Sequence, residues 1–220
     1  VGNKGRIPDG DYYDRAYGDN RWGSTYIVSN AIGQGEVETT PIQLANMAAA
    51  IGNRGYYYTP HIIKSIEGDT IPNKYTTRKY TTIDKQHFEP VIQGMFDVYN
   101  KGTAKTLRVP GIEISGKTGT AENFVKIDSV KTQLTDHSIF VAFAPKDNPT
   151  IAIAVFIENG YWGSRFAGRM ASLMIEKYIK GYITRTDMEN WILTHSLENE
   201  YAKPYSGKPF KINGETTLQV

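Results

Sequence analysis

Residues 111–120 read Gly-Ile-Glu-Ile-Ser-Gly-Lys-Thr-Gly-Thr, and two incompatible structures could carry this string. From Gly111 to Thr118 it has the spacing of a phosphate-binding loop, a glycine-rich turn between a buried strand and a helix. The spacer, however, is β-branched and alternates as a strand does, residues 107–110 are no apolar strand, and residues 121–126 show no helical stripe. The pattern therefore favours a β-strand that carries Lys117-Thr118-Gly119. The alternative is a P-loop nucleotide hydrolase at residues 111–118.

Two more strands are predicted after this segment. Residues 138–144 and 151–157 are apolar runs, and residues 145–149 between them are turn-forming, which indicates an antiparallel hairpin. Because residues 151–157 are apolar on both faces, we expect them to form a central strand.

The clearest helix signal in the first third of the chain is Thr40-Pro41-Ile42-Gln43. Thr is an N-cap, Pro occupies the first helical position, and Gln completes a capping box. We expect this helix to run to residue 51 and to stop at Gly52-Asn53 in a left-handed conformation. Residues 1–30 show no period, which predicts a loop packed by Trp22 and Tyr26.

Two further helices are predicted around the strands. Residues 88–99 have a helical spacing of apolar residues, and Gly102 ends that helix. The last helix opens at Gly163-Ser164 and stops at Gly181. Its apolar stripe is expected to face the core, as are Met47 and Met95; the stripe consists of Phe166, Met170, Leu173, Met174 and Tyr178.

The composition excludes several classes of function. The 220-residue chain has 25 Lys+Arg and 23 Asp+Glu, and this near balance excludes a protein built around electrostatic nucleic-acid binding. With no Cys, it has no disulfide, zinc–thiolate site, iron–sulfur cluster or Cys nucleophile. The four His are far apart, and we expect neither a metal nor a cofactor. Glu113, Glu122 and Asp136 could form a carboxylate pair, but such charges are usually solvated or salt-bridged.

Several motifs together resemble class B penicillin-binding proteins. Lys-Thr-Gly, together with Ser-x-x-Lys and Ser-Asp-Asn, is a signature of penicillin-binding proteins and class A β-lactamases. Besides Lys117-Thr118-Gly119, the chain has the block from Gly33 to Gly55 and then Gly102-Thr103-Ala104, which resemble segments of class B proteins. Within the class, Ile32-Gly33-Gln34-Gly35 and the upstream Trp22 look most like penicillin-binding protein 2, the elongation transpeptidase.

This resemblance implies an α+β fold, an antiparallel sheet packed by helices, of the penicillin-binding-protein and serine β-lactamase type. It covers about residues 1–183, interpreted as the C-terminal portion of a transpeptidase domain that lacks the N-terminal strands and helices of the fold. Residues 184–220 are then a polar C-terminal extension, in which Asp187 could cap a short helix. The block at residues 33–55 looks like the transpeptidases rather than the β-lactamases.

The chain departs from the family at the nucleophile. No Ser is followed by Lys three residues later, and no Ser-x-Asn occurs. In the family both motifs precede the point where this chain begins, so we expect a fragment of a larger enzyme. We predict that this chain alone is inactive and forms no acyl-enzyme. A non-catalytic interaction module with the same fold is the other alternative.

The activity implied by the resemblance is peptidoglycan D,D-transpeptidation, with stem peptides as substrates and β-lactams bound by the same groups. Lys117 would attract the terminal carboxylate, and the hydroxyls of Thr118 and Thr120 would hydrogen-bond it. The backbone N–H of Thr120 would be an oxyanion-hole donor. Gly116 and Gly119 would leave room for a ligand lying along the strand.

The resemblance also implies partners and a location. The parent protein is expected in the bacterial inner membrane, facing the periplasm, with other cell-wall elongation proteins; its anchor is not in this chain, where no apolar run approaches the length of a membrane span. In the family, a strand from the missing part lies beside the one predicted at residues 151–157. We therefore expect an open apolar edge there, covered by a homodimer or a rearranged terminus.

Overall fold

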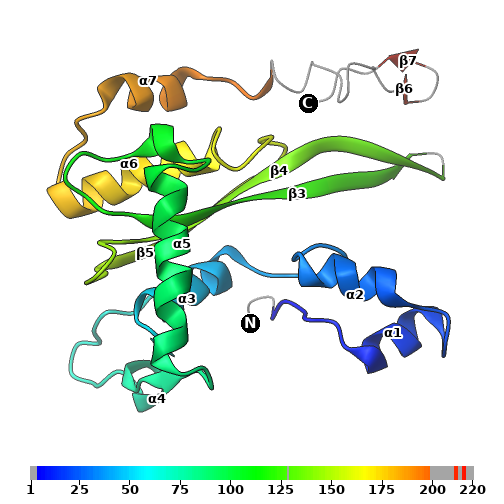
Figure 1. The fold of residues 1–220 in the computed structure, drawn as a ribbon, viewed down its shortest axis with the longest axis horizontal. Helices are drawn as coiled ribbons and strands as arrows, with labels where there is room; N and C mark the ends of the chain where they lie inside the picture. The colour runs from blue at the N-terminus through cyan, green and yellow to red at the C-terminus, as the bar shows by residue number, and fades with distance from the viewer. Residues whose placement is uncertain (1–3, 128, 199–210, 213–214, 217–220) are drawn as a thin grey trace. The chain divides into compact units, whose positions relative to one another are not determined.

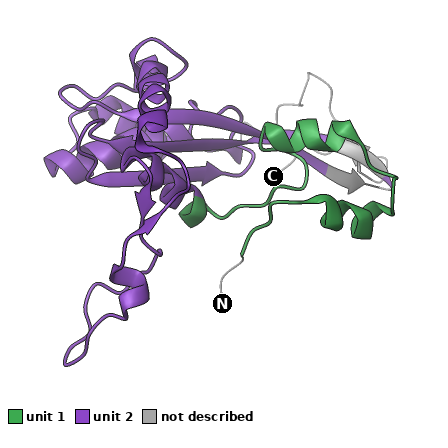
Figure 2. Cartoon of the chain, turned by 60° about the horizontal axis from the view of Figure 1, so that its bottom comes forward, with its two compact units in different colours: residues 1–43 green, residues 44–220 purple. Residues whose placement is uncertain are grey.

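The computed structural model describes residues 4–127, 129–198, 211–212 and 215–216 (Figure 1). The chain divides into two compact units, residues 1–43 and residues 44–220, and the division falls inside helix α3 (Figure 2).

The first unit contains two helices, α1 (Gly10–Tyr17) and α2 (Ser24–Ala31), so the prediction of a loop over residues 1–30 was wrong. The Asp9 side chain accepts a hydrogen bond from the Tyr12 amide (2.8 Å) and caps α1. Tyr13 is the buried residue of α1, and its ring lies 5.1 Å from Trp22 and 5.2 Å from Tyr26. Trp22 and Tyr26 do pack this region, as expected. The sequence did not predict these helices because each has only eight residues, of which α1 buries one and α2 none, and so few buried positions give no periodicity.

Helix α3 (Pro41–Gly52) begins where the capping box predicted. The Thr40 amide donates to Gln43 Oε1 (2.8 Å), and the Gln43 amide donates to Thr40 Oγ1 (3.4 Å). The expected left-handed stop at Gly52-Asn53 was wrong, because the left-handed residue after the helix is Arg54, with a φ of 58°. Gly52 serves packing instead: a Cβ atom there would lie 2.9 Å from the ring of Phe143.

The segment after α3 contains two short strands and a helical turn. Strand β1 (Tyr56–Tyr57) pairs antiparallel with β2 (Lys79–Tyr80), and α4 (Asn73–Thr76) lies between them in the chain. A 3₁₀ turn, η1 (Lys85–His87), leads into α5 (Phe88–Asn100), which confirms the helix predicted over residues 88–99. The buried residues of α5 are Phe88, Ile92, Met95 and Tyr99. A second 3₁₀ turn, η2 (Lys105–Leu107), follows.

The main sheet contains the three predicted strands in antiparallel order: β3 (Ser115–Ile127), β4 (Val130–Ala144) and β5 (Ile151–Ile157). β4 lies between β3 and β5, and β5 pairs only with β4 among the described residues. Residues 151–157 therefore have the open edge that was expected in this chain, and their central position beside a further strand stays a prediction. The P-loop alternative is wrong. Its Lys117 lies in a strand that returns as a hairpin into β4, and no helix follows it.

The two faces of the sheet are covered by different helices. Phe143 of β4 packs with the Phe88, Ile92 and Met95 side chains of α5. Phe140 and Ala142 have the opposite parity in β4 and pack with α6 (Ala167–Lys180), on the face opposite to the one that Phe88, Ile92 and Met95 contact. Tyr99, near the end of α5, reaches this second face, where its ring packs edge-on against Phe140. The chain continues with α7 (Thr186–Thr194), β6 (Lys211–Ile212) and β7 (Glu215–Thr216). Much of the segment predicted as an extension, residues 199–210 in particular, lies outside the described residues.

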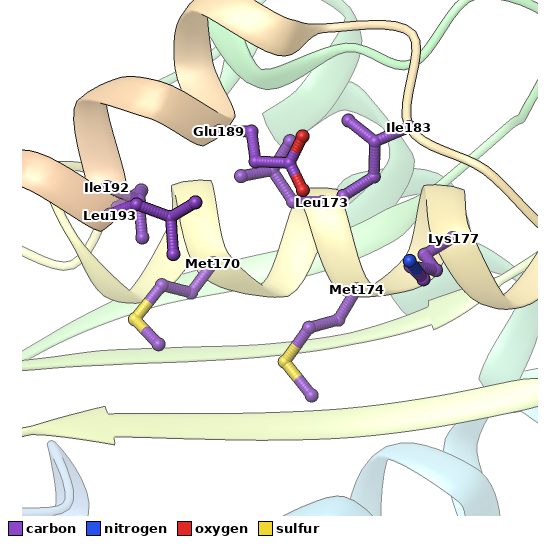
Figure 3. A pocket seen from close by; sticks show the side chains of 8 residues that line it. All are labelled: Met170, Leu173, Met174, Lys177, Ile183, Glu189, Ile192 and Leu193. Atoms are coloured by element: carbon purple, nitrogen blue, oxygen red, sulfur yellow. The ribbon is translucent and has the colours of Figure 1, made fainter.

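Helix α6 presents a different face to the sheet from the one predicted. Its buried residues are small or polar: Ala167, Gly168, Ala171, Ser172 and Glu176, with Leu173 and Ile175. Met174 is 52% exposed and Tyr178 is 61% exposed, so these two expected core residues lie outward, and Met47 is 46% exposed as well. Met170 and Met174 instead line a pocket with Ile192 and Leu193 of α7 (Figure 3). Small residues on the sheet side let α6 approach β4 closely, which a search for large apolar residues cannot detect.

Within the described part of the chain, no helix is both long and apolar enough to cross a lipid bilayer.

Candidate active site

The candidate site is the outer edge of β3, the edge that faces away from β4. In the strand register, Lys117 pairs with Val141, Thr118 with Phe140 and Thr120 with Ser138. β3 is the last strand of its sheet among the described residues, so the outer edge is not occupied by a neighbouring strand there.

The position of Gly163 shows which backbone groups point to that edge. A Cβ atom on Gly163 would lie 2.3 Å from the Ile139 oxygen, 2.6 Å from the Gly119 oxygen and 2.9 Å from the Gly119 nitrogen. These polar groups of the paired residues Gly119 and Ile139 therefore lie together between the strands. Because successive residues of an antiparallel ladder point alternately to the partner and away from it, the N–H and C=O of Thr118 and Thr120 point to the outer edge.

The Lys117 ammonium lies at the same edge. Its Nζ donates to the carbonyl oxygen of Thr118 at 2.7 Å. Side chains alternate between the two faces along a strand. The Lys117 side chain therefore projects from the face on which Phe88, Ile92 and Met95 of α5 pack, whereas those of Thr118 and Thr120 project from the face covered by α6. The structure therefore brings together the ammonium of Lys117 and the backbone groups of Thr118 and Thr120 along the edge, while their side chains start from different faces.

The hydroxyl of Thr118 has a neighbour from another part of the chain. Thr103 Oγ1 lies 3.3 Å from Thr118 Oγ1, within hydrogen-bonding distance. Thr103 belongs to the turn between α5 and β3, which lies beside the site although it is 15 residues away in sequence. Gly102-Thr103-Ala104 is one of the motifs that resemble the family, but its sequence predicted no role for Thr103.

A glycine-rich segment, residues 160–168, supports the strand from behind. The Ser138 hydroxyl, opposite Thr120, donates to the Trp162 carbonyl (3.1 Å) and accepts from the Ala167 amide (3.3 Å). Side chains on Gly163 or Gly168 would clash, the latter with Leu107 at 2.6 Å. From the sequence, Gly163 was predicted only to open a helix. The repeated glycines at positions 160, 163 and 168 were the signal that could have indicated close packing.

Of the three carboxylates weighed as a pair, two come together. The register of β3 and β4 shifts between Ala121 and Asn123, which brings Glu122 near Asp136. Burial raises the pKa of Asp136, and the negative charge of Glu122 adds to the increase. Glu113 lies elsewhere, with its carbonyl accepting from the Lys146 amide (3.0 Å). Within the described ranges, no three His, Asp or Glu residues are grouped so that they could hold a metal ion.

Comparison with known proteins places this geometry in a family. The family model described as the penicillin binding protein transpeptidase domain matches residues 7–176. The peptidoglycan D,D-transpeptidase MrdA of Acinetobacter baumannii is 34% identical over 159 residues, which are 67% of this chain and 24% of that protein.

Solved structures agree with this match. The structure of penicillin-binding protein 2 from Helicobacter pylori in complex with MreC superposes with a TM-score of 0.64 at 27% identity, over 81% of this chain and 32% of that one. The imipenem acyl-enzyme of penicillin-binding protein A from M. tuberculosis gives a TM-score of 0.55 at 28% identity, over 69% and 33%.

The chain thus spans about a quarter to a third of the length of these relatives. The family match covers most of its residues, and the observed strand order and helices are those of an α+β fold with an antiparallel sheet. The chain therefore belongs to the penicillin-binding protein transpeptidase family, with class B proteins of the penicillin-binding protein 2 type among its relatives.

Proposed function

We propose that this chain forms the carboxylate-binding wall of a peptidoglycan D,D-transpeptidase active in cell-wall elongation. In this proposal a parent protein contains the chain, and another segment supplies the nucleophilic serine, because no Ser here has Lys three residues later. Residues 1–183 would be the C-terminal portion of the transpeptidase domain, and residues 184–220 an extension of it.

The observation that carries the proposal is the arrangement along the outer edge of β3. The Lys117 ammonium, bound at the Thr118 carbonyl, and the outward N–H of Thr120 lie on an edge that no described strand pairs. A compact cation next to unpaired backbone donors is suited to a small carboxylate and to a developing oxyanion. A ligand backbone could lie along this edge as an added strand does.

The reaction that we propose follows from these roles. The serine oxygen gives up its proton and attacks the penultimate D-Ala carbonyl, whose oxygen becomes negative and accepts a hydrogen bond from the N–H of Thr120. The C–N bond to the last D-Ala breaks, its nitrogen takes up the proton, and D-Ala leaves as an amine while Lys117 and the Thr118 hydroxyl hold its carboxylate. The amine of a second stem peptide then attacks the acyl-enzyme, the C–O bond to the serine breaks, and the proton that this amine loses restores the serine hydroxyl.

We also infer the ligands and partners from relatives. The M. tuberculosis protein was solved as an imipenem acyl-enzyme, which supports β-lactams as ligands of the parent. The H. pylori relative was solved with MreC, which supports other elongation proteins as partners. With these partners we place the parent at the bacterial inner membrane, on its periplasmic side. We further propose that this chain alone associates as a homodimer through the open edge of β5, since unpaired strand edges pair readily.

The test of the function is covalent labelling by a fluorescent penicillin. We expect the parent protein to be labelled and the 220-residue chain alone to remain unlabelled. In the parent, Lys117→Met should slow labelling roughly 10- to 100-fold, because hydrogen bonds to charged groups contribute about 1.5–3 kcal/mol. Lys101→Met is the control, since Lys101 is 72% exposed and pairs with Asp97 on α5.

Three outcomes would overturn parts of the proposal. A parent protein that is never labelled would leave the non-catalytic interaction module as the better description. Labelling of the isolated chain would show that a nucleophile lies within it. Equal rates for Lys117→Met and Lys101→Met would remove Lys117 from the site.

A further inference from the structure

Arg185, which lies beyond the end of the family match at residue 176, is the centre of a buried polar network. Its Nε binds Glu176 Oε2 (2.9 Å), and the side chains are 15% and 0% exposed, respectively. Its Nη1 donates to Ser172 Oγ (2.6 Å) and to the carbonyl of Leu107 (3.1 Å), and its Nη2 donates to the Ser172 carbonyl (2.9 Å). The guanidinium therefore joins the start of α7, the middle of α6 and the end of η2.

The carbonyl of Leu107 is bound twice in this network. Besides Arg185, the Ser172 hydroxyl donates to it at 2.6 Å. Leu107 is 1% exposed. Its carbonyl is held by two hydrogen bonds, one from Ser172 of α6 and one from Arg185, the residue that precedes α7. An arginine fork that is satisfied at several nitrogens positions its partners more tightly than a lysine could.

Leu107 closes the turn that carries Thr103. At its start, the amides of Lys101 and Gly102 donate to the Asp97 carbonyl, each at 2.9 Å, so α5 holds that end. At its close, the Leu107 amide donates to the Ala104 carbonyl (2.9 Å). The turn over residues 102–107 is therefore held by α5 at one end and by the Arg185 network at the other, and between them Thr103 reaches Thr118 of β3.

We propose that Thr103 is a positioning residue for the Thr118 hydroxyl, and that Arg185, from outside the family match, keeps Thr103 in place. This inference rests on the proposed function, because it assigns the Thr103–Thr118 contact to recognition of the ligand carboxylate. A hydroxyl can donate only one proton. When Thr118 donates to the carboxylate, Thr103 can donate to Thr118 and so fix the direction of its O–H.

The experiment compares the acylation rate constant of the parent protein for a penicillin with that for the methyl ester of the same penicillin. The ester lacks the charge that the Thr118 hydroxyl is proposed to bind. We expect Thr103→Val to lower the rate for the acid about tenfold and to change the rate for the ester little, because the lost bond supports a contact with a charged group. Thr103→Ser keeps the hydroxyl and should retain most of the acid rate.

Arg185→Lys tests the network, and Arg54→Lys is its matched control. Arg54 is 14% exposed on its side chain, binds Glu89 through Nε (2.8 Å), and donates to the Gly52 carbonyl (2.9 Å), but it does not contact the turn at residues 102–107. Both substitutions remove a guanidinium fork of similar burial. Only Arg185→Lys should lower the ratio of the acid rate to the ester rate, by about three- to tenfold.

The outcomes separate this inference from the proposed function. If the parent is labelled and Lys117→Met slows labelling, the proposed function holds independently of Thr103. The inference is then overturned if Thr103→Val slows acid and ester equally, or if Arg185→Lys lowers the ratio no more than Arg54→Lys does. Two results together support the inference. Thr103→Val should lower the ratio of the acid rate to the ester rate while Thr103→Ser retains it, and of the two arginine variants only Arg185→Lys should lower that ratio.

Discussion

The absence of a side chain at Gly163 sets how closely the segment before α6 approaches the candidate site. A Cβ atom there would meet the backbone oxygens of Gly119 in β3 and Ile139 in β4, which cannot move without shifting these paired strands. We expect Gly163→Ala to destabilise the chain by about 1–3 kcal/mol, as overpacking does, and to slow penicillin labelling of the parent. Gly94→Ala is the control: Gly94 lies inside α5 with open space around it, so the same change should stabilise by about 0.5–1 kcal/mol. Urea unfolding measures both, and equal effects would contradict the packing argument.

Glu176 makes the free energy of unfolding of the chain depend on pH in the acid range. Burial alone would raise the pKa of Glu176, but hydrogen bonds from Thr184 and Arg185 and the Arg185 charge outweigh it and lower that pKa to about 2. A carboxyl with a lowered folded-state pKa stabilises the fold above its unfolded value near 4.5, and this stabilisation is lost as the pH falls towards 2. The loss expected between neutral pH and the acid end is on the order of 3 kcal/mol.

Glu176→Gln should remove this pH dependence. At pH 7 the variant should be less stable by about 3–5 kcal/mol, because Arg185 is left without its carboxylate. Between pH 5 and pH 2, the difference between wild type and variant should shrink. Asp136, whose pKa is raised by burial, acts in the opposite direction but is common to both proteins, so it cancels in the difference. Urea midpoints across the pH range measure this, and a constant difference would show that Glu176 is not the titrating group.

At the level of elements, helix α6 is capped by a residue of the sheet rather than by the side chain of its own N-cap residue. Its N-cap residue, Phe166, makes no side-chain cap, and the Ala167 amide donates instead to Ser138 Oγ of β4 (3.3 Å). Ser138→Ala should destabilise the chain by about 1–3 kcal/mol, since it leaves the Ala167 amide buried without this partner, whereas the Trp162 carbonyl keeps its hydrogen bond from the Arg165 amide (3.0 Å). Thr194→Ala, which removes an exposed hydroxyl bonded within α7, should stay within about 0.5 kcal/mol. Equal urea midpoints for the two variants would argue against the capping role.

The elements that could be predicted from sequence are those whose signal is local. The capping box at Thr40 predicted α3, periodicity predicted α5, alternation predicted β3, and two apolar runs around a turn predicted β4 and β5. The buried face of α6 could not be predicted, because it depends on how closely the sheet approaches the helix. Whether residues 151–157 are central or at an edge likewise depends on which strands are present.

The candidate site divides in the same way. Lys117, Thr118 and Thr120 could be proposed from sequence because one motif contains them, and the structure has them together on strand β3. Thr103 and Arg185 could not be assigned, since Thr103 meets Thr118 across 15 residues and Arg185 meets Leu107 across 78. No local pattern encodes such contacts; they exist only once α5, α6 and the sheet have packed.

For the whole molecule, the main sheet has two outer edges that no described strand pairs, on β3 and on β5. We propose that the first binds ligands and that the second joins two copies of the isolated chain. Phe156 on β5 is 39% exposed. The substitution Phe156→Lys would place a charge beside the edge, and natural edge strands are kept from pairing by such charges. In sedimentation velocity, the wild-type chain should form a dimer as its concentration rises, and Phe156→Lys should weaken the dimer about tenfold or more. Met174→Lys, in the pocket between α6 and α7, is the control and should leave the dimer unchanged. If Met174→Lys dissociates the dimer while Phe156→Lys does not, the copies meet through the helices; if the wild type stays monomeric throughout, the β5 edge does not pair.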